Sequence, residues 1–242
     1  MNVFSIRVAD HVVGVETLHI RSMALCRDYL TDVSPEFVVR TTQQDIDQER
    51  ICYEKQNGEC TLWDGALEMI ALHRKLSEQL IDSDVFMMHG AAVAYHDETF
   101  IFSAKSGIGK TTHIQKWLEH LPDAFVVNGD KPFIITNPSP QVCGSPWAGK
   151  ENLYRNTIVP LKAIIFIERA PENHIERISF PDAFPRLLLQ THRPADTEKM
   201  RKTLALMKTL DGRVAFYRFH INNFKDDCFQ VAYNALVNGI ES

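Results

Sequence analysis

The chain has 242 residues, of which 45% are hydrophobic and 24% charged, a composition typical of a folded protein with a sizeable core. The net charge of −5 comes without a basic tract, which argues against nucleic acid as a partner. No apolar run reaches the roughly 18 residues that cross a membrane, and the N-terminal sequence lacks the pattern of a signal peptide. We therefore expect a soluble, cytoplasmic protein with neither a nucleic-acid nor a membrane partner.

Short β-branched runs dominate residues 1 to about 60. "VFSIRVA" and "HVVGVE" flank Asp10 and predict a hairpin, and "EFVVRTT" predicts a third strand. Apolar residues then recur at helical spacing, which predicts a helix from about Trp63 to Ile81. Together these elements predict a small N-terminal α+β region over residues 1–84, in which no chemistry is recognisable.

From residue 85 the pattern changes to apolar strands with helices between them, which predicts an α/β domain over residues 85–242. A loop rich in Pro and Gly is predicted over residues 137–152, and the apolar run at residues 161–169 is typical of a strand buried on both faces. Further strands are expected at residues 87–95, 99–104, 124–130, 131–136 and 213–221, and helices near Lys110, at the N-cap Asp196, and near Asp226 or Asp227.

The clearest chemical signal is a glycine-containing stretch between a predicted strand and a predicted helix. "AKSGIGKT" fits the phosphate-binding loop (P-loop) pattern, except that Ala104 replaces the first glycine. Glycines let backbone N–H groups approach phosphate oxygens, and the helix N-terminus adds positive potential. Lys110 is expected to reach the β and γ phosphates, and the Thr111 hydroxyl to bind Mg²⁺. The predicted nucleotide-binding residues are Ser106, Gly107, Ile108, Gly109, Lys110, Thr111 and Thr112, and the simpler alternative is a turn without a ligand.

Three further positions are candidates for the chemistry. Asp130 ends the apolar run that follows the helix predicted near Lys110. A carboxylate there could hold Mg²⁺ or take a proton from an acceptor hydroxyl. The alternative is a turn aspartate. His89 lies on the predicted strand that precedes the strand leading into the P-loop. From spacing alone, a structural histidine is the favoured interpretation. Lys150 and Glu151 belong to a loop that either covers the site or is simply solvated.

Five blocks of sequence stand out from residue 88 onward: "MHGAAVAYHDETFIFSAKSGIGKTTH", "VVNGDKPFI", "GSPWAGKEN", "VPLKAIIFIER" and "LLLQTHRP". Together they resemble the HPr kinase/phosphorylase superfamily. The similarity extends over about residues 85–238 and is strongest to its shorter bacterial branch of HPr kinase-like, or serine kinase-like, proteins. The P-loop by itself is widespread, whereas its combination with an upstream His-Gly and four downstream blocks is specific.

The resemblance implies a P-loop kinase core of the HPr kinase/phosphoenolpyruvate carboxykinase type, with a mixed sheet and flanking helices. It also implies ATP, Mg²⁺ and phosphoryl transfer to a serine hydroxyl. By position, His89 matches the active-site histidine, Lys110 the P-loop lysine, Thr111 the metal-binding hydroxyl and Asp130 the proton-accepting second aspartate of an Asp-Asp pair. Gly129 stands where the first aspartate of that pair is expected. The family's metal-binding Glu signature is not visible, and "GSPWAGKEN" occupies the comparable place.

The sequence therefore predicts an ATP- and Mg²⁺-dependent kinase acting on a serine of a protein, a peptide or a small molecule. Catalysis is assigned to Asp130, His89 and Lys110, Mg²⁺ binding to Thr111 and Asp130, and acceptor contacts to the loop of Lys150 and Glu151. A non-catalytic ATP-binding sensor of the same fold is the alternative that Gly129 favours. A carboxykinase-like enzyme of metabolites is a weaker third. Members of the family often assemble, so a homo-oligomer is a further expectation from the resemblance.

Overall fold

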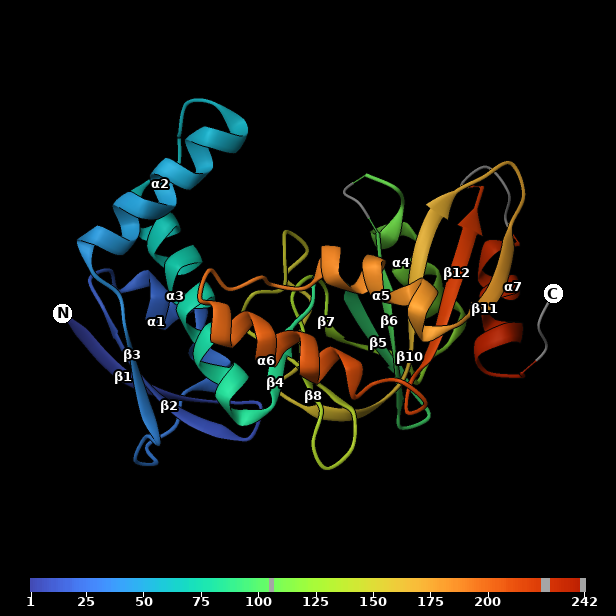
Figure 1. Ribbon diagram of the computed structural model, residues 1–242, viewed down its shortest axis with the longest axis horizontal. Helices are drawn as coiled ribbons and strands as arrows, with labels where there is room; N and C mark the ends of the chain where they lie inside the picture. The colour runs from blue at the N-terminus through green and yellow to red at the C-terminus, as the bar shows by residue number, and fades with distance from the viewer. Residues whose placement is uncertain (105–106, 223–226, 240–242) are drawn as a thin grey trace. The chain divides into compact units, whose positions relative to one another are not determined.

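The computed structural model of the chain describes residues 1–104, 107–222 and 227–239. Contacts between residues divide the chain into two compact units, Met1–Ser83 and Asp84–Ser242. Figure 1 traces the elements of both units from blue at the N-terminus to red at the C-terminus. Within the described ranges, no helix is both long enough and apolar enough to cross a membrane.

The first unit, Met1–Ser83, is built on a three-stranded sheet. Two strands form the predicted antiparallel hairpin, and the third, also predicted, adds in parallel to the second. The hairpin turn places Ala9 and Asp10 at φ values of 51° and 63°, which a two-residue turn between twisted strands requires. The elements are β1 (Asn2–Val8), β2 (His11–Thr17), α1 (Arg21–Leu25), β3 (Phe37–Arg40), α2 (Gln43–Asn57) and α3 (Asp64–Leu80), with 3₁₀ turns at Arg27–Tyr29 and Ile81–Ser83.

The α2 helix is an addition to the predicted elements, because its largely polar sequence carries no apolar stripe to reveal it. Local hydrogen bonds fix its start instead. The Thr42 hydroxyl accepts a hydrogen bond from the N–H of Asp45, and the Asp45 carboxylate accepts one from the N–H of Thr42. This capping box satisfies backbone donors that the first helical turn would otherwise leave unpaired. The strand-rich interpretation of residues 1 to about 60 was therefore incomplete.

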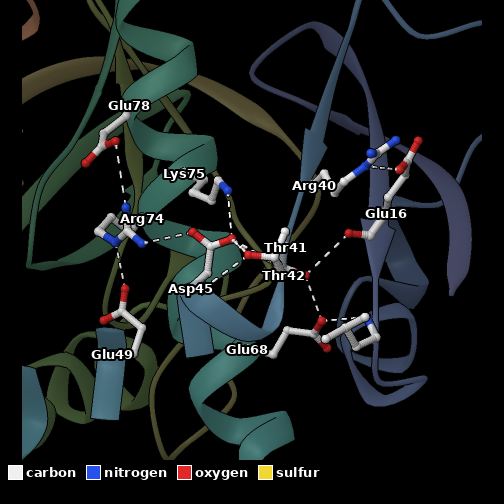
Figure 2. A network of polar contacts seen from close by, with 11 residues as sticks. Glu16, Arg40, Thr41, Thr42, Asp45, Glu49, Glu68, Arg74, Lys75 and Glu78 are labelled. Carbon is white, nitrogen blue, oxygen red and sulfur yellow. Dashed lines mark hydrogen bonds and ion pairs between the residues drawn. The ribbon is translucent and has the colours of Figure 1, made fainter. Parts of the chain in front are cut away.

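A buried carboxylate on α3 joins that helix to α1 and to the segments that follow β2 and β3 (Figure 2). Glu68 is fully buried and accepts hydrogen bonds from the backbone N–H groups of Leu18 and His19, at 2.6 and 2.9 Å. The hydroxyls of Ser22 and Thr41 donate to the same carboxylate at 3.1 and 2.7 Å. Four donors therefore compensate the loss of water around the charge, as a buried ionised group requires.

Half-buried ion pairs join α2 to α3, and Figure 2 draws them together with the contacts of Glu68. Arg74 of α3 donates to Glu49 of α2 at 2.6 Å, and Lys75 donates to Asp45 at 2.8 Å. Asp45 thus serves both the capping box and the contact between the helices. This double use couples the start of α2 to the face of α3.

Over its described residues, the second unit, Asp84–Ser242, contains a mixed sheet of nine strands centred on β10. The first residues of β10 pair antiparallel with β9, and the rest lies between β6 and β12, parallel to both. A register shift between Leu161 and Ala163 lies within the parallel pairing with β6, just after the antiparallel segment. The strands are β4 (Val85–Met87), β5 (Ala91–Tyr95), β6 (Glu98–Ser103), β7 (Phe125–Asn128), β8 (Phe133–Ile135), β9 (Gln141–Cys143), β10 (Ile158–Arg169), β11 (His174–Ile178) and β12 (Ala215–Ile221).

In the part of this unit that the structure describes, four helices pack on the sheet. α4 and α7 contact each other, and their apolar side chains, Trp117 of α4 and Phe229 of α7 among them, share a core with Phe100, Phe102 and Phe219 of the strands. α5 and α6 contact each other as well, and Figure 1 shows both of them crossing in front of the sheet. The result is a mixed α/β unit with flanking helices. Their bounds are α4 (Lys110–His120), α5 (Phe180–Gln190), α6 (Thr197–Lys208) and α7 (Cys228–Leu236).

The structure corrects three predictions in this unit. The single strand expected over residues 87–95 is two strands, β4 and β5, which pair with different neighbours. The loop expected over residues 137–152 contains the short strand β9. The helix α5 and the strand β11 have no counterpart in the predicted set, and Pro185 disguises α5 because proline is unusual beyond the first turn of a helix.

The core between α4 and the sheet encloses a titratable ring. His113 is 2% exposed, and its Nε2 accepts a hydrogen bond from the indole N–H of Trp117 at 2.9 Å. The rings of Phe102 and Phe219 lie edge-on at centroid distances of 4.8 and 5.2 Å. Burial lowers the pKa of His113 from 6.5 to about 3, with a smaller contribution from the charge of Lys116. The ring is therefore neutral in the folded protein.

We expect His113 to make the stability of this unit fall as the pH falls below 6.5. Above that pH the ring is neutral in both states, whereas between 6.5 and about 3 only the unfolded chain takes the proton. The free energy of unfolding should then drop by roughly 1.4 kcal/mol per pH unit, about 2 kcal/mol at pH 5. Urea unfolding at several pH values, compared with His113→Gln, measures this slope. An equal slope in both proteins would contradict the expectation.

Candidate functional site

The predicted phosphate-binding loop lies where its chemistry requires, between the end of β6 and the start of α4. Gly107 and Gly109 have φ values of 79° and 122°, a region that side chains with a Cβ rarely adopt. Gly109 is the N-cap of α4, so Lys110, Thr111 and Thr112 form the first helical turn with its unpaired N–H groups. Lys105 and Ser106 fall outside the described residues, and the prediction for Ser106 is therefore untested.

An arginine that sequence reasoning missed ties this loop to the sheet. Arg169, the last residue of β10, donates from its guanidinium to the carbonyl of Gly107 at 2.6 Å. One peptide group of the loop is thereby fixed to the neighbouring parallel strand. No spacing rule connects these positions, because they are brought together only by the pairing of β6 with β10.

Three predicted catalytic side chains meet beside the loop. His89 Nε2 lies 3.1 Å from Asp130 Oδ1 and 3.2 Å from Lys110 Nζ, and the ammonium and this carboxylate oxygen are 3.8 Å apart. Lys131, which was not predicted, adds a further cation 3.2 Å from Asp130 Oδ2. One carboxylate is thus surrounded by two lysines and a histidine.

The position of His89 differs from the prediction. It lies in the connection between β4 and β5, not on a strand, and its contacts with Asp130 and Lys110 exceed what a purely structural histidine would need. Its neighbour Gly90 donates its N–H to the carbonyl of Asp130 at 2.9 Å. The backbone at Gly90 packs closely against β6, because a Cβ on Gly90 would lie 2.8 Å from the Ile101 side chain and 3.2 Å from the Phe102 carbonyl.

Asn128, also missed from the sequence, holds the turn that carries Asp130. It is fully buried at the end of β7, and its Oδ1 accepts hydrogen bonds from the N–H groups of Asp130 and Lys131 at 2.9 and 2.6 Å. Its Nδ2 donates to the carbonyl and the hydroxyl of Ser145 at 2.9 and 3.0 Å. A single amide therefore fixes the turn against the following loop, in the manner of an Asx turn.

Burial and the charges of the cluster shift two pKa values. Burial alone would raise the pKa of Asp130, but the hydrogen bond from His89 and the charges of Lys131, His89 and Lys110 outweigh it and hold that pKa below its usual range. Burial lowers the pKa of Lys110, an effect that the charges of Asp130 and Glu151 oppose. Asp130 is consequently ionised at neutral pH and serves as a hydrogen-bond acceptor.

These side chains line a cavity of about 520 Å³, a size suited to a phosphate-bearing small molecule. Ala104 and Ile108 are the exceptions among the described P-loop residues, because they line a separate cavity of about 230 Å³ beside α5. The larger cavity brings together both parts of the prediction, the P-loop and the loop after β9. Its lining residues are His89, Gly107, Gly109, Lys110, Thr111, Thr112, Gly129, Asp130, Gly149, Lys150 and Glu151.

The Thr111 hydroxyl points toward a carboxylate, Oε1 of Glu151 at 3.4 Å. A hydroxyl and a carboxylate are hard oxygen ligands, and Mg²⁺ commonly takes one or two carboxylates and fills its other positions with water and substrate phosphates. The pair therefore fits a magnesium ion at the phosphates. Within the described ranges, no three His, Cys, Asp or Glu side chains gather in a way that could hold a metal ion by themselves.

Gly129 has no space for a side chain. A Cβ there would lie 2.9 Å from the carbonyl of Ala148 and 3.4 Å from that of Leu153, and both obstacles are backbone. We expect Gly129→Ala and Gly129→Asp to lower the free energy of unfolding by roughly 1–3 kcal/mol, the usual cost of overpacking. Thermal unfolding of both variants measures it. A Gly129→Asp protein as stable as the wild type would show that the loop accommodates the missing aspartate.

Volume alone does not single out this cavity. A second one of about 560 Å³ lies where β11 ends and β12 begins, lined by Lys162, Arg177 and Arg213 among others. Arg213 there donates to the carbonyls of Thr136 and Pro138. The cavity at the P-loop is distinguished by its chemistry, a cation, an acid and a histidine in mutual contact.

Comparison with known proteins finds distant similarity among solved structures. No protein-family profile matches the sequence, and no curated protein matches it. Among solved structures, the HPr(Ser) kinase/phosphatase from Coxiella burnetii is similar over 63% of this chain and 88% of its own chain, at 9% sequence identity and a TM-score of 0.39. This is a remote likeness between mixed α/β proteins, so residue roles are taken from the geometry of this chain.

Proposed function

We propose that the unit Asp84–Ser242 binds ATP with Mg²⁺ and transfers the γ-phosphoryl group to a serine hydroxyl of a protein, a peptide or a small molecule. The observation that carries the proposal is the meeting of Lys110, His89 and Asp130 at one wall of the P-loop cavity. Phosphoryl transfer asks a protein mainly for positioning and for stabilisation of charge, and this wall offers both.

Each side chain has a role that its position supports. The N–H groups at the start of α4 and the Lys110 ammonium would bind the β and γ phosphates. Thr111 and Glu151 would hold Mg²⁺ directly, and Asp130, already paired with cations, through water. The bound ion would neutralise charge on the phosphate oxygens.

The transfer step forms a bond between the acceptor oxygen and the γ phosphorus while the bond to the β–γ bridging oxygen breaks, and ADP leaves. The hydroxyl proton passes to the Asp130 carboxylate, which is ionised and within the cavity. His89 Nε2 and Lys110 Nζ face the same space and would contact the transferred group. Lys150, on the cavity-lining loop, is the proposed contact for the acceptor.

The alternative function is an ATP-binding sensor without turnover, which the lack of a carboxylate at Gly129 favours. Incubation with γ-labelled ATP, Mg²⁺ and a panel of free serine, serine peptides and carrier proteins distinguishes the two. Transfer of label to one acceptor supports the kinase. Tight ATP binding with neither transfer nor phosphate release would support the sensor, and no ATP binding would contradict both.

A further inference from the structure

The backbone of His89 is held on both sides. Its N–H donates to the carbonyl of Gln190 at 2.6 Å, at the C-terminal end of α5, and its own carbonyl accepts from the hydroxyl of Ser103 at 2.8 Å. The helix and the loop strand β6 therefore fix where the Cα of His89 lies. Rotation of the imidazole ring is the freedom that remains.

The side chain of Gln190 reaches the ring itself. Its Oε1 lies 3.1 Å from His89 Nδ1, and because a carbonyl oxygen only accepts, Nδ1 must carry the hydrogen. On the other side of the ring, Nε2 lies 3.2 Å from Lys110 Nζ, and because an ammonium only donates, Nε2 must offer its lone pair. Both of these contacts are satisfied when Nδ1 carries a hydrogen and Nε2 does not.

The contact with Asp130 calls for a different state of Nε2 but leaves Nδ1 unchanged. Its Oδ1 lies 3.1 Å from Nε2, so it can accept a hydrogen bond from that atom only when Nε2 also carries a hydrogen. In that state Nδ1–H still donates to Gln190. Whichever partner Nε2 serves, the hydrogen on Nδ1 stays in place, and Nε2 is the ring atom that faces the cavity.

We propose that the side chain of Gln190 is a positioning residue that fixes the tautomer and ring orientation of His89, so that Nε2 faces the phosphate cavity. The part that this ring has in phosphoryl transfer rests on the proposed function, whereas the tautomer does not. The backbone carbonyl of Gln190 anchors His89 whatever its side chain is. Substitution of the side chain therefore separates ring orientation from folding.

Nitrogen NMR of the protein without nucleotide tests the tautomer directly. The His89 signals are identified by their loss in His89→Asn. We expect Nδ1 to carry the hydrogen in the wild type and in Gln190→Glu, which keeps an acceptor oxygen, and to lose this preference in Gln190→Met, which has a similar size and no acceptor. Leu189→Ala is the matched control on the same helix, because Leu189 is 65% exposed. An unchanged His89 signature in Gln190→Met would overturn the proposal.

Kinetics supply a second measurement. The reaction followed is ATP hydrolysis to water. Gln190→Met should lower kcat about 10-fold or more with little change in the KM for ATP, and Gln190→Glu should keep most of the wild-type kcat. General acid–base groups commonly contribute about 10²–10⁴-fold to the rate, and a positioning residue controls part of that contribution. An equal loss in both variants would contradict a role through the acceptor oxygen. A wild type without turnover would count against the kinase, while the NMR result would still decide the role of Gln190.

Discussion

Lys110→Ala should abolish tight ATP binding and lower turnover by about 100-fold or more, the effect typical of losing a donor that stabilises charge in the transition state. The Lys110 side chain is 16% exposed and lines the cavity. Its Nζ lies 3.2 Å from Nε2 of His89 and 3.8 Å from Oδ1 of Asp130. Equilibrium binding of ATP and release of labelled phosphate measure the two effects separately.

The loss should be local to the site. Removal of the ammonium leaves Asp130 with its contacts to His89 and Lys131, so the turn that carries it should persist. Lys116→Ala, which removes a lysine from the same helix about two turns from the N-terminus of α4, is the matched control and should bind ATP normally. A folded Lys110→Ala protein with wild-type affinity and turnover would refute the phosphate-binding role.

Glu68→Ala should destabilise the unit Met1–Ser83 by roughly 3–5 kcal/mol. The substitution leaves four donors, from Leu18, His19, Ser22 and Thr41, without their acceptor, and each buried unsatisfied group costs about 1–3 kcal/mol before relaxation. Urea unfolding followed by a probe in this unit, such as fluorescence of Trp63, gives the change in the free energy of unfolding.

Two controls sharpen that experiment. Glu78→Ala removes a carboxylate from the same helix whose ion pair with Arg74 is 3.9 Å long, and should cost less than about 1 kcal/mol. Hydrogen exchange should accelerate at the amides of Leu18 and His19 in Glu68→Ala alone. Equal stability of the Glu68 and Glu78 variants would mean that water replaces the carboxylate without cost.

The sequence predicted the parts of the site that are contiguous, and missed those that depend on pairing. The P-loop glycines and Lys110 follow each other in the chain and were recognised by spacing. Three residues that the sequence did not reveal act from other elements: Arg169 binds the loop, Gln190 contacts His89, and Asn128 holds the turn of Asp130. No local pattern reveals which strands or helices will be neighbours.

The helices and strands divide in the same way, into those with a clear local pattern and those without one. Strands with an apolar sequence, such as β6 and β10, were found, whereas α2 and α5 were not, because polar residues in the first and a proline in the second hide the helical period. His89 was expected on a strand because "MMHGAAVAY" is continuously apolar around it. The separate pairing of β4 with β8 and of β5 with β6 and β7 breaks that run in two.

The three-way pairing of β10 has a consequence for how the chain acquires its structure. Its parallel partners β6 and β12 are each about 50–60 residues away along the chain, so joining them closes long loops before any contact is gained. Chains dominated by such distant pairings form their native state slowly, on the scale of milliseconds to seconds. Because the P-loop follows β6 and Arg169 ends β10, the ability to bind a phosphate should emerge late in refolding, after the hairpin of β1 and β2 has already formed.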